Sequence, residues 1–167
     1  LKLVKTNKIK NISKFNTYYQ LNTYYQGFIK SRGEIICFLD SDDYLEKNKL
    51  SKIDYYFSKY KNLEFIFDRP KMINLKGIIS RNRKNYSFRE NKWPLFPPQS
   101  CISVKRKTIK KNIEKLFKKK FPLTTLDFRI AALSDQFRDN AFFLDNELTY
   151  YFQHDDNESN KNFSLFN

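Results

Sequence analysis

Three aspartates lie within four positions of the segment FLDSDDYL, residues 38–45. Asp40, Asp42 and Asp43 repel one another unless a positive charge or a hydrogen-bond donor lies among them. In an extended Asp-x-Asp segment, the first and third side chains lie on one face of the chain. Two such carboxylates can bind Mg²⁺ or Mn²⁺ while water and phosphate oxygens complete an octahedral shell. The spacing therefore predicts a divalent metal site that would neutralise a diphosphate and stabilise it as a leaving group.

Other interpretations use the same residues. A solvated acidic turn before a helix would also contain aspartates, because Asp is favoured in turns and at helix N-termini. An EF-hand loop counted from Asp40 would need Gly and Glu where Leu45 and Ser51 stand. A nucleophilic aspartate of the phosphatase type is usually followed by Thr or Gly-Thr, which Tyr44-Leu45 does not match. From the residues alone, both a metal site and a solvated acidic turn remain possible interpretations.

The neighbouring segments predict where the aspartates lie. GEIICFLD (33–40) is apolar without alternation, as expected for a strand buried on both faces of a sheet. Apolar residues at helical spacing predict helices over 16–31 and 45–60. One face of the second helix is formed by Leu50, Ile53, Phe57 and Tyr60. Ligands of parallel α/β sheets bind beyond the carboxyl ends of the strands. The aspartates are expected at such an end.

The rest of the chain continues the alternation of strands and helices. Residues 68–99 contain Asp68-Arg69-Pro70, Gly77 and WPLFPP, which favour loops and short strands. The pattern predicts an α/β fold in a single domain over 1–167. The further expected elements are strands at 2–5, 64–67, 100–104, 141–144 and 148–152, and helices at 105–120 and 124–137.

The chain is strongly basic, with 32 Lys and Arg against 18 Asp and Glu and a net charge of +14. This charge indicates an anionic partner, such as nucleic acid, an acidic membrane surface or a phosphorylated substrate, or else a solvated lysine surface. The helix at 105–120 could contact anionic lipid or simply face water. No apolar stretch reaches the ~18 residues of a membrane span. Cys37 and Cys101 form no metal-binding or disulfide pattern, so a cytoplasmic location is expected, with peripheral contact at the inner face of the membrane.

GFIKSRGEIICFLDSDDYLEKNKL (27–50) resembles the donor-site core of family 2 glycosyltransferases with the GT-A fold. Residues 100–106, 126–133 and 148–159 more weakly resemble the family's basic strand end, acidic helix and His–Ser tail. The resemblance implies a GT-A-like, Rossmann-related mixed sheet flanked by helices. The residues that match the core in register are Gly27, Ser31, Gly33, Glu34, Phe38, Leu39, Asp40, Asp42, Asp43, Lys49 and Leu50.

Transfer of a sugar from a nucleotide-diphosphate donor to an acceptor hydroxyl is the activity that this resemblance implies. The donor would be a UDP-sugar, the cofactor Mn²⁺ or Mg²⁺, and the acceptor a glycan, a lipid-linked compound or another hydroxyl compound. Asp42 would be the main metal ligand, Asp40 would contact the metal or the ribose, and Asp43 would support the site. The residues that the resemblance assigns to the donor and the metal are Asp40, Ser41, Asp42, Asp43, Gly33 and His154.

Asp127 is the general base that the resemblance implies. An inverting transfer needs one carboxylate that takes the proton of the attacking hydroxyl. Asp127 also lies early in its predicted helix, where negative charge is favoured in any case, and Asp135 competes for the role. His154, the only histidine, could equally be a solvated residue at a strand end.

Two departures from the family pattern limit the resemblance. Many relatives carry Arg-Asn where this chain has Tyr24-Tyr25, so a contact with the sugar nucleotide is in doubt there. Only about 30 residues precede the strand at 33–40, where the family has a strand–helix–strand unit that binds the nucleobase. The resemblance thus implies the C-terminal two-thirds of the domain, N-terminally truncated.

Two competing hypotheses remain. One is an inactive fragment of such an enzyme. The other is a basic module that binds nucleic acid or an anionic surface. Nucleic acid fits less well, because no RNP-like or helix-turn-helix pattern is present and three aspartates repel phosphates.

Overall fold

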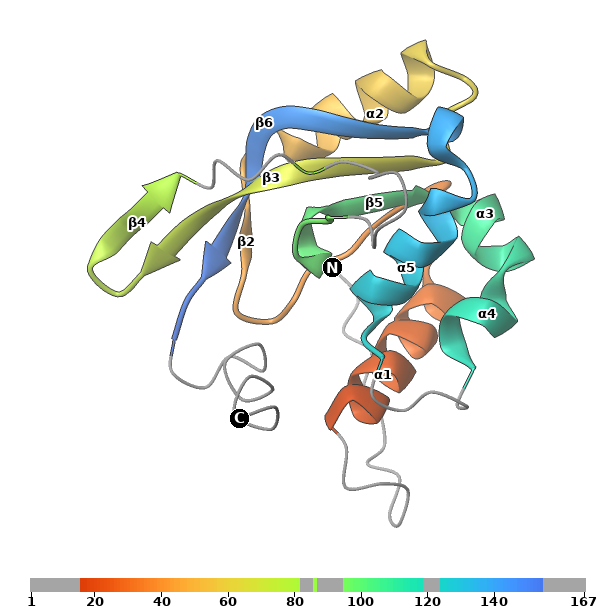
Figure 1. The fold of residues 1–167 in the computed structure, drawn as a ribbon, viewed down its shortest axis with the longest axis horizontal. Coiled ribbons are helices and arrows are strands. Elements are labelled where there is room, and N and C mark those ends of the chain that lie inside the picture. The colour runs from red at the N-terminus through yellow and green to blue at the C-terminus, as the bar shows by residue number, and fades with distance from the viewer. Residues whose placement is uncertain (1–15, 82–85, 87–94, 119–123, 155–167) are drawn as a thin grey trace.

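A computed structural model describes residues 16–81, 86, 95–118 and 124–154. Its helices and strands alternate along the chain as the sequence predicts (Figure 1). In chain order they are α1 (Asn16–Lys30), β1 (Ile35–Cys37), β2 (Tyr44–Leu45), α2 (Lys49–Lys59), β3 (Phe65–Asn74), β4 (Gly77–Arg81), the 3-10 helix η1 (Gln99–Cys101), β5 (Ile102–Lys105), α3 (Arg106–Lys111), α4 (Ile113–Phe117), α5 (Leu126–Asp135), the 3-10 helix η2 (Arg138–Asn140) and β6 (Ala141–Phe152).

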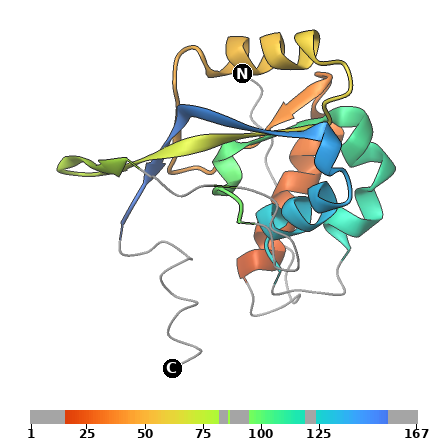
Figure 2. The same cartoon turned by 45° about the horizontal axis from the view of Figure 1, so that its top comes forward.

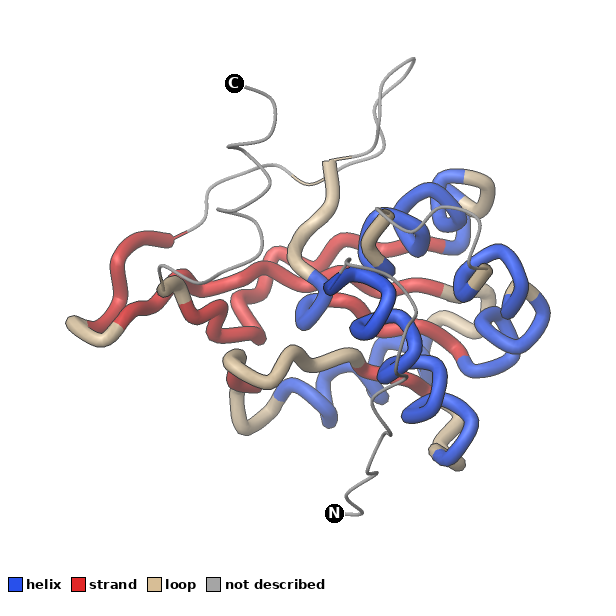
Figure 3. Tube along the Cα trace, turned by 90° about the horizontal axis from the view of Figure 1, so that it is seen from below, coloured by secondary structure: helices blue, strands red, loops and turns tan. Residues whose placement is uncertain are grey.

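The strands of the described ranges form one mixed sheet in the order β1-β5-β3-β6-β2, with β4 paired to β3. Strands β3 and β6 are parallel, and the other pairs are antiparallel. Helix α2 covers one face of the sheet, and α1, α3, α4 and α5 cover the other (Figures 1 and 2). The hairpin of β3 and β4 projects beyond the helices (Figure 3). This arrangement is the mixed sheet flanked by helices that the sequence predicts.

Strand β3 divides the core into its two layers. Successive side chains of a strand point to opposite faces. Phe65 and Phe67 therefore pack against the helices α1, α4 and α5, together with residues such as Leu21 and Ile130. Ile66 faces α2 in the second cluster. A strand buried on both faces has no polar alternation, which explains the unbroken apolar run at 65–67.

Strand β1 is shorter than the strand expected at 33–40. It has three half-buried residues, Ile35–Cys37, and it pairs antiparallel with β5. Within the described ranges β1 has no second partner, so it is an edge strand. Its side chains do pack on both faces, with Ile36 against one core cluster and Ile35 and Cys37 against the other. A place within a parallel sheet is the part of the expectation that is wrong here. Phe38 adds one more hydrogen bond, from its N–H to the Ile102 carbonyl at 3.1 Å, before the chain turns at Asp40.

Strand β3 is longer than expected, because it continues through Asp68, Arg69 and Pro70, where the sequence favours loops. The register against β6 shifts on both sides of Arg69. A proline has no N–H for the ladder, and irregular pairing is where a strand tolerates one. Strand β6 likewise runs unbroken over the two strands expected at 141–144 and 148–152.

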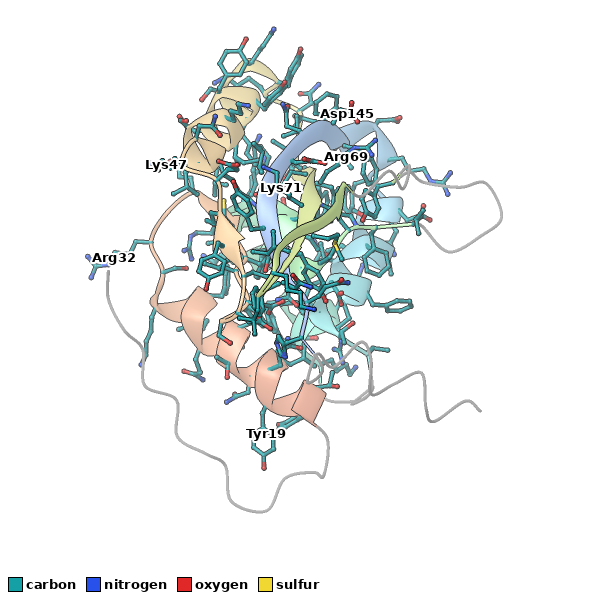
Figure 4. All side chains as sticks on the ribbon, turned by 90° about the vertical axis from the view of Figure 1, so that its left-hand side faces the viewer. Tyr19, Arg32, Lys47, Arg69, Lys71 and Asp145 are labelled. Atoms are coloured by element: carbon teal, nitrogen blue, oxygen red, sulfur yellow. The ribbon has the colours of Figure 1, made fainter. Side chains whose placement is uncertain are left out.

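Two basic side chains of β3, Arg69 and Lys71, have acidic partners on neighbouring segments. Figure 4 labels Arg69, Lys71 and Asp145. Arg69 pairs with Asp145 at 2.7 Å, and Lys71 pairs with Glu46 at 3.3 Å. The Tyr150 hydroxyl also donates to Glu46, at 2.5 Å. Part of the positive charge of the chain is thus neutralised by ion pairs with acidic side chains beside β3.

The single helix expected at 105–120 is two helices, α3 and α4, with Asn112 between them. The side-chain Nδ2 of Asn112 donates to the Thr108 carbonyl at 2.9 Å. An asparagine that bonds to nearby backbone in this way competes with helix continuation. None of the helices in the described residues is long and apolar enough to cross a membrane. The strand expected at 2–5 lies outside the described residues.

Arg106 closes the C-terminal end of α1. Its guanidinium donates to the Phe28 carbonyl at 3.3 Å, to the Gly33 carbonyl and to the Ser31 hydroxyl. It also lies over the Phe28 ring, 5.0 Å from the ring centre. The last carbonyls of a helix lack partners within the helix, and a planar guanidinium can serve several of them at once. Two residues of the family-like core, Ser31 and Gly33, thus contribute to the end of this helix.

Replacing Arg106 by Lys is expected to lower the free energy of unfolding by about 1–2 kcal/mol, because an ammonium cannot reach all three acceptors and loses the ring contact. Urea unfolding measures the difference. Arg32→Lys at an exposed position is the control, with an expected change within about 0.5 kcal/mol. Equal effects of the two substitutions would contradict this role.

Candidate functional site

The segment that carries the aspartates crosses one end of the sheet. It leaves β1 at one edge and enters β2 at the other. The Asp40 N–H donates to the Ser100 hydroxyl at 2.9 Å, and the Asp43 N–H donates to the Asp40 carbonyl at 3.3 Å. These bonds close a turn over 40–43, so the extended Asp-x-Asp geometry expected from the sequence is wrong. Each aspartate consequently meets different partners.

Asp40 faces helix α1. The Tyr24 hydroxyl donates to Oδ1 of Asp40, and the Gln20 amide approaches the same oxygen at 3.5 Å. Burial raises the pKa of Asp40 to about 6, opposed by the Tyr24 hydrogen bond and reinforced by the charges of nearby carboxylates. The hydrogen-bond donor beside Oδ1 of Asp40 is therefore a neutral phenol.

Asp42 lies against the end of β6. Its Oδ2 is 2.9 Å from Nε2 of His154. The two side chains remain 37% and 35% exposed, so a ligand can reach both. The sequence predicts Asp42 and His154 as two members of one site, and the fold brings them together across 112 positions of the chain.

Asp43 points into the protein. It is 6% exposed, and its Oδ1 accepts the Phe152 N–H at 3.0 Å. Burial raises the pKa of this carboxyl, while the nearby Ser100 hydroxyl and the Phe152 N–H oppose the rise. Its Oδ2 is buried, and none of the described groups forms a hydrogen bond of good geometry with it. The contacts of Asp43 hold the turn against β6.

Asp127 lies in the first turn of α5, half-buried, and its Oδ1 accepts the Phe128 N–H at 2.7 Å. Burial raises its pKa. Its charge also raises the pKa of Asp40 and of Tyr24, which places it on the same side of the molecule as the aspartate turn. The rival base, Asp135, ends the same helix and pairs with Arg138 at 2.8 Å.

The other two predicted donor contacts lie apart from each other. Ser41 is exposed in the turn, beside Asp40 and Asp42. Gly33 precedes β1 and is separated from the turn by the length of that strand. Its carbonyl is engaged by Arg106. Both assignments stay predictions.

A buried ion pair beneath the turn was not predicted from the sequence. Lys49 Nζ is 2.7 Å from Asp68 Oδ2, and both side chains are fully buried. Lys49 also donates to the Ser100 carbonyl at 2.6 Å and to the Thr149 hydroxyl at 2.7 Å. The Thr149 hydroxyl donates in turn to Asp68 Oδ1 at 2.7 Å. This network joins α2, β3, β6 and η1, and Ser100 connects it to the Asp40 backbone.

The described residues contain no group of three or more His, Cys, Asp or Glu side chains arranged to hold a metal ion. The turn brings two such donors together, Asp42 Oδ2 and His154 Nε2, 2.9 Å apart. Mg²⁺ and similar ions are commonly held by one or two carboxylates while water and substrate phosphates supply the other ligands. Imidazole and carboxylate are also ligands that Mn²⁺ accepts. The donor set fits an ion that arrives with a diphosphate.

Comparison with known sequences gives no family: no family model matches the chain. No curated protein gives a significant match either. The sequence resemblance to family 2 glycosyltransferases therefore stays a prediction.

Comparison with solved structures identifies similar folds. The crystal structure of S. aureus TarS 1-349 in complex with UDP-GlcNAc matches with a TM-score of 0.52 at 18% identity, covering 76% of this chain and 37% of that chain. A second crystal structure of TarS 1-349 matches with a TM-score of 0.50 at 15% identity, covering 75% and 37%. The chain thus spans little more than a third of these proteins. The likeness confirms the GT-A-like glycosyltransferase fold that the sequence predicts.

Proposed function

We propose that this chain binds a nucleotide-diphosphate sugar at the 40–43 turn and transfers the sugar to an acceptor hydroxyl. The observation that carries the proposal is the contact of Asp42, in the turn that also holds Asp40, with His154, which follows β6. Asp127 is close enough for its charge to raise the pKa of Asp40. The fold is shared with TarS, and one TarS structure contains UDP-GlcNAc. This likeness supports a UDP-sugar as the donor.

The metal ligands in this proposal are Asp42 and His154, with Asp40 beside them. Their free oxygens and the imidazole nitrogen would hold Mn²⁺ or Mg²⁺ at the exposed side of the turn. The bound ion would neutralise the diphosphate and stabilise it as it leaves. His154 would bind the metal through a ring nitrogen that carries no proton. Asp43 would support the turn from within.

Asp127 is the general base in this proposal. The acceptor oxygen forms a bond to the anomeric carbon while the bond from that carbon to the diphosphate oxygen breaks. The proton of the acceptor hydroxyl passes to the Asp127 carboxylate. A raised pKa makes a carboxylate a stronger base, and burial raises the pKa of Asp127. Attack on the face opposite the diphosphate inverts the anomeric centre.

Binding of UDP in the presence of Mn²⁺, followed by isothermal titration calorimetry, tests the site. Wild-type protein is expected to bind UDP only with the metal, and Asp42→Ala is expected to weaken binding at least about 10-fold, because it removes a ligand and the partner of His154. Asp54→Ala, at an exposed position on α2, is expected to bind like the wild type.

Two results would contradict the proposal. One is UDP binding that Mn²⁺ does not affect. The other is Asp42→Ala protein that binds like the Asp54→Ala control. Metal-independent binding of nucleic acid that weakens steeply with salt would instead favour a basic binding module.

A further inference from the structure

We propose that Tyr24 is a positioning residue that fixes Asp40 through Oδ1 and so presents Oδ2 to the metal ion of a bound nucleotide diphosphate. The inference rests on the proposed function and adds a residue to it. It concerns a position that the family resemblance left in doubt.

Two donors from α1 meet a single oxygen of Asp40. The Tyr24 hydroxyl donates to Oδ1, and Gln20 approaches Oδ1 at 3.5 Å. Residues four apart lie one above the other on a helix face, so α1 presents both donors in the same direction. The Asp40 backbone is held separately, by the Ser100 hydroxyl at 2.9 Å. In the part of the chain that the structure covers, no hydrogen bond involves Oδ2 of Asp40, which leaves that oxygen for a ligand.

Tyr24 is itself held in place. Its ring packs edge-on against Phe38, with the ring centres 5.6 Å apart. Phe38 is 4% exposed and comes two residues before Asp40. A phenol has an ordinary pKa of about 10. Tyr24 therefore remains a hydrogen-bond donor across the physiological pH range.

The type of hydrogen-bond donor at Asp40 affects how well this carboxylate can bind a metal ion. A hydrogen bond to one oxygen of a metal-binding carboxylate fixes the direction of the other, and losing such a partner typically costs 10–100-fold in metal affinity. A cationic donor would pair with the charge of Asp40 and compete with a divalent ion. A neutral phenol orients the carboxylate and leaves its negative charge for the metal. Tyr24 is thus suited to a metal-binding carboxylate.

Tyr24→Phe separates positioning from direct contact. Tyr25→Phe is the matched control, because that ring packs against Phe117, with the centres 5.4 Å apart. Each variant is titrated with Mn²⁺ at saturating UDP and with UDP at saturating Mn²⁺. Tyr24→Phe is expected to raise the half-saturating Mn²⁺ concentration about 10-fold. The Kd for UDP at saturating Mn²⁺ should change less than about 2-fold, and Tyr25→Phe should change neither quantity.

Thermal unfolding of the metal-free variants accompanies the titrations, so that a folding defect is recognised. Weaker UDP binding at saturating Mn²⁺ would mean that Tyr24 contacts the nucleotide directly, and it would overturn the inference. An unchanged Mn²⁺ requirement with a lowered melting temperature would show a structural role only, and would overturn it too. Failure of the unmodified protein to bind UDP with Mn²⁺ would instead contradict the proposed function itself.

Discussion

Replacing Lys49 by Met is expected to lower the free energy of unfolding by about 3–5 kcal/mol, because it leaves a buried carboxylate without its partner. Lys49 and Asp68 are both fully buried, 2.7 Å apart. Methionine keeps much of the length of the lysine side chain and removes the charge. The Ser100 carbonyl and the Thr149 hydroxyl lose a donor in the same change. Urea unfolding of the wild type and the variant measures the loss.

A second substitution tests whether the unpaired Asp68 carboxylate causes this loss of stability. Asp68→Asn removes the stranded charge and keeps an acceptor for the Thr149 hydroxyl, so the double variant Lys49→Met with Asp68→Asn should recover much of the stability. Lys52→Met, on the same helix, is the control, with an expected change within about 0.5 kcal/mol. A double variant no more stable than Lys49→Met alone would show that the unpaired charge is not the cause.

Replacing Asp40 by Asn is expected to stabilise the metal-free protein at neutral pH and to leave its stability near pH 4 unchanged. Burial raises the pKa of Asp40 from 3.8 to about 6. A carboxyl whose pKa is raised on folding favours the folded state below its unfolded pKa, and that contribution is lost as the pH rises through the folded value. The wild type should therefore lose stability between about pH 4 and pH 6. At pH 7.5 the loss should amount to about 1–3 kcal/mol.

Asparagine has no such titration and can still accept the Tyr24 hydrogen bond. Thermal unfolding from pH 4 to pH 8 in metal-free buffer should show the two curves diverging as the pH rises. Other carboxyls with raised pKa values, such as Asp43 and Asp68, are present in both proteins and largely cancel. Parallel curves for wild type and Asp40→Asn would contradict the prediction. Divergence would mean that the turn holds a carboxylate at a cost in stability.

The helices were the most predictable part of the fold. Helix α1 spans Asn16–Lys30 against an expected 16–31, because apolar spacing indicates which face of a helix is buried. The same spacing placed Ile53 and Phe57 correctly on the buried face of α2. It was wrong for Leu50 and Tyr60, which are 59% and 45% exposed. The spacing of apolar residues shows which face of a helix is apolar. The position of the sheet determines how much of that face is buried.

The strands were predicted less completely, because strand boundaries depend on partners far away in the sequence. Pro70 reads as a loop residue, yet β6 accommodates it at a register shift. Local sequence also could not show that Asp68, next to an apolar run, is paired with Lys49 on another element.

For the candidate site, residue types and spacing predicted Asp40 and Asp42, and the family resemblance added His154. The structure shows the contact between Asp42 and His154, while the roles of these residues stay predictions. It could not show that Asp40 faces Tyr24, since the turn over 40–43 depends on a hydroxyl 60 positions along the chain. The substitution of Tyr24-Tyr25 for the common Arg-Asn was the feature that could have pointed to it.

The parallel pairing of β3 with β6 has a consequence for how the protein is made. Phe65 pairs with Ala141, so the middle of the sheet joins segments that emerge from the ribosome far apart in time. Contacts between residues so distant in sequence form slowly. A long loop must close first, and the loss of chain entropy comes before the contacts stabilise the fold. Until β6 has been synthesised, one edge of β3 lacks its main partner. An unpaired strand edge can pair with other chains, so this edge is open to aggregation in the nascent chain.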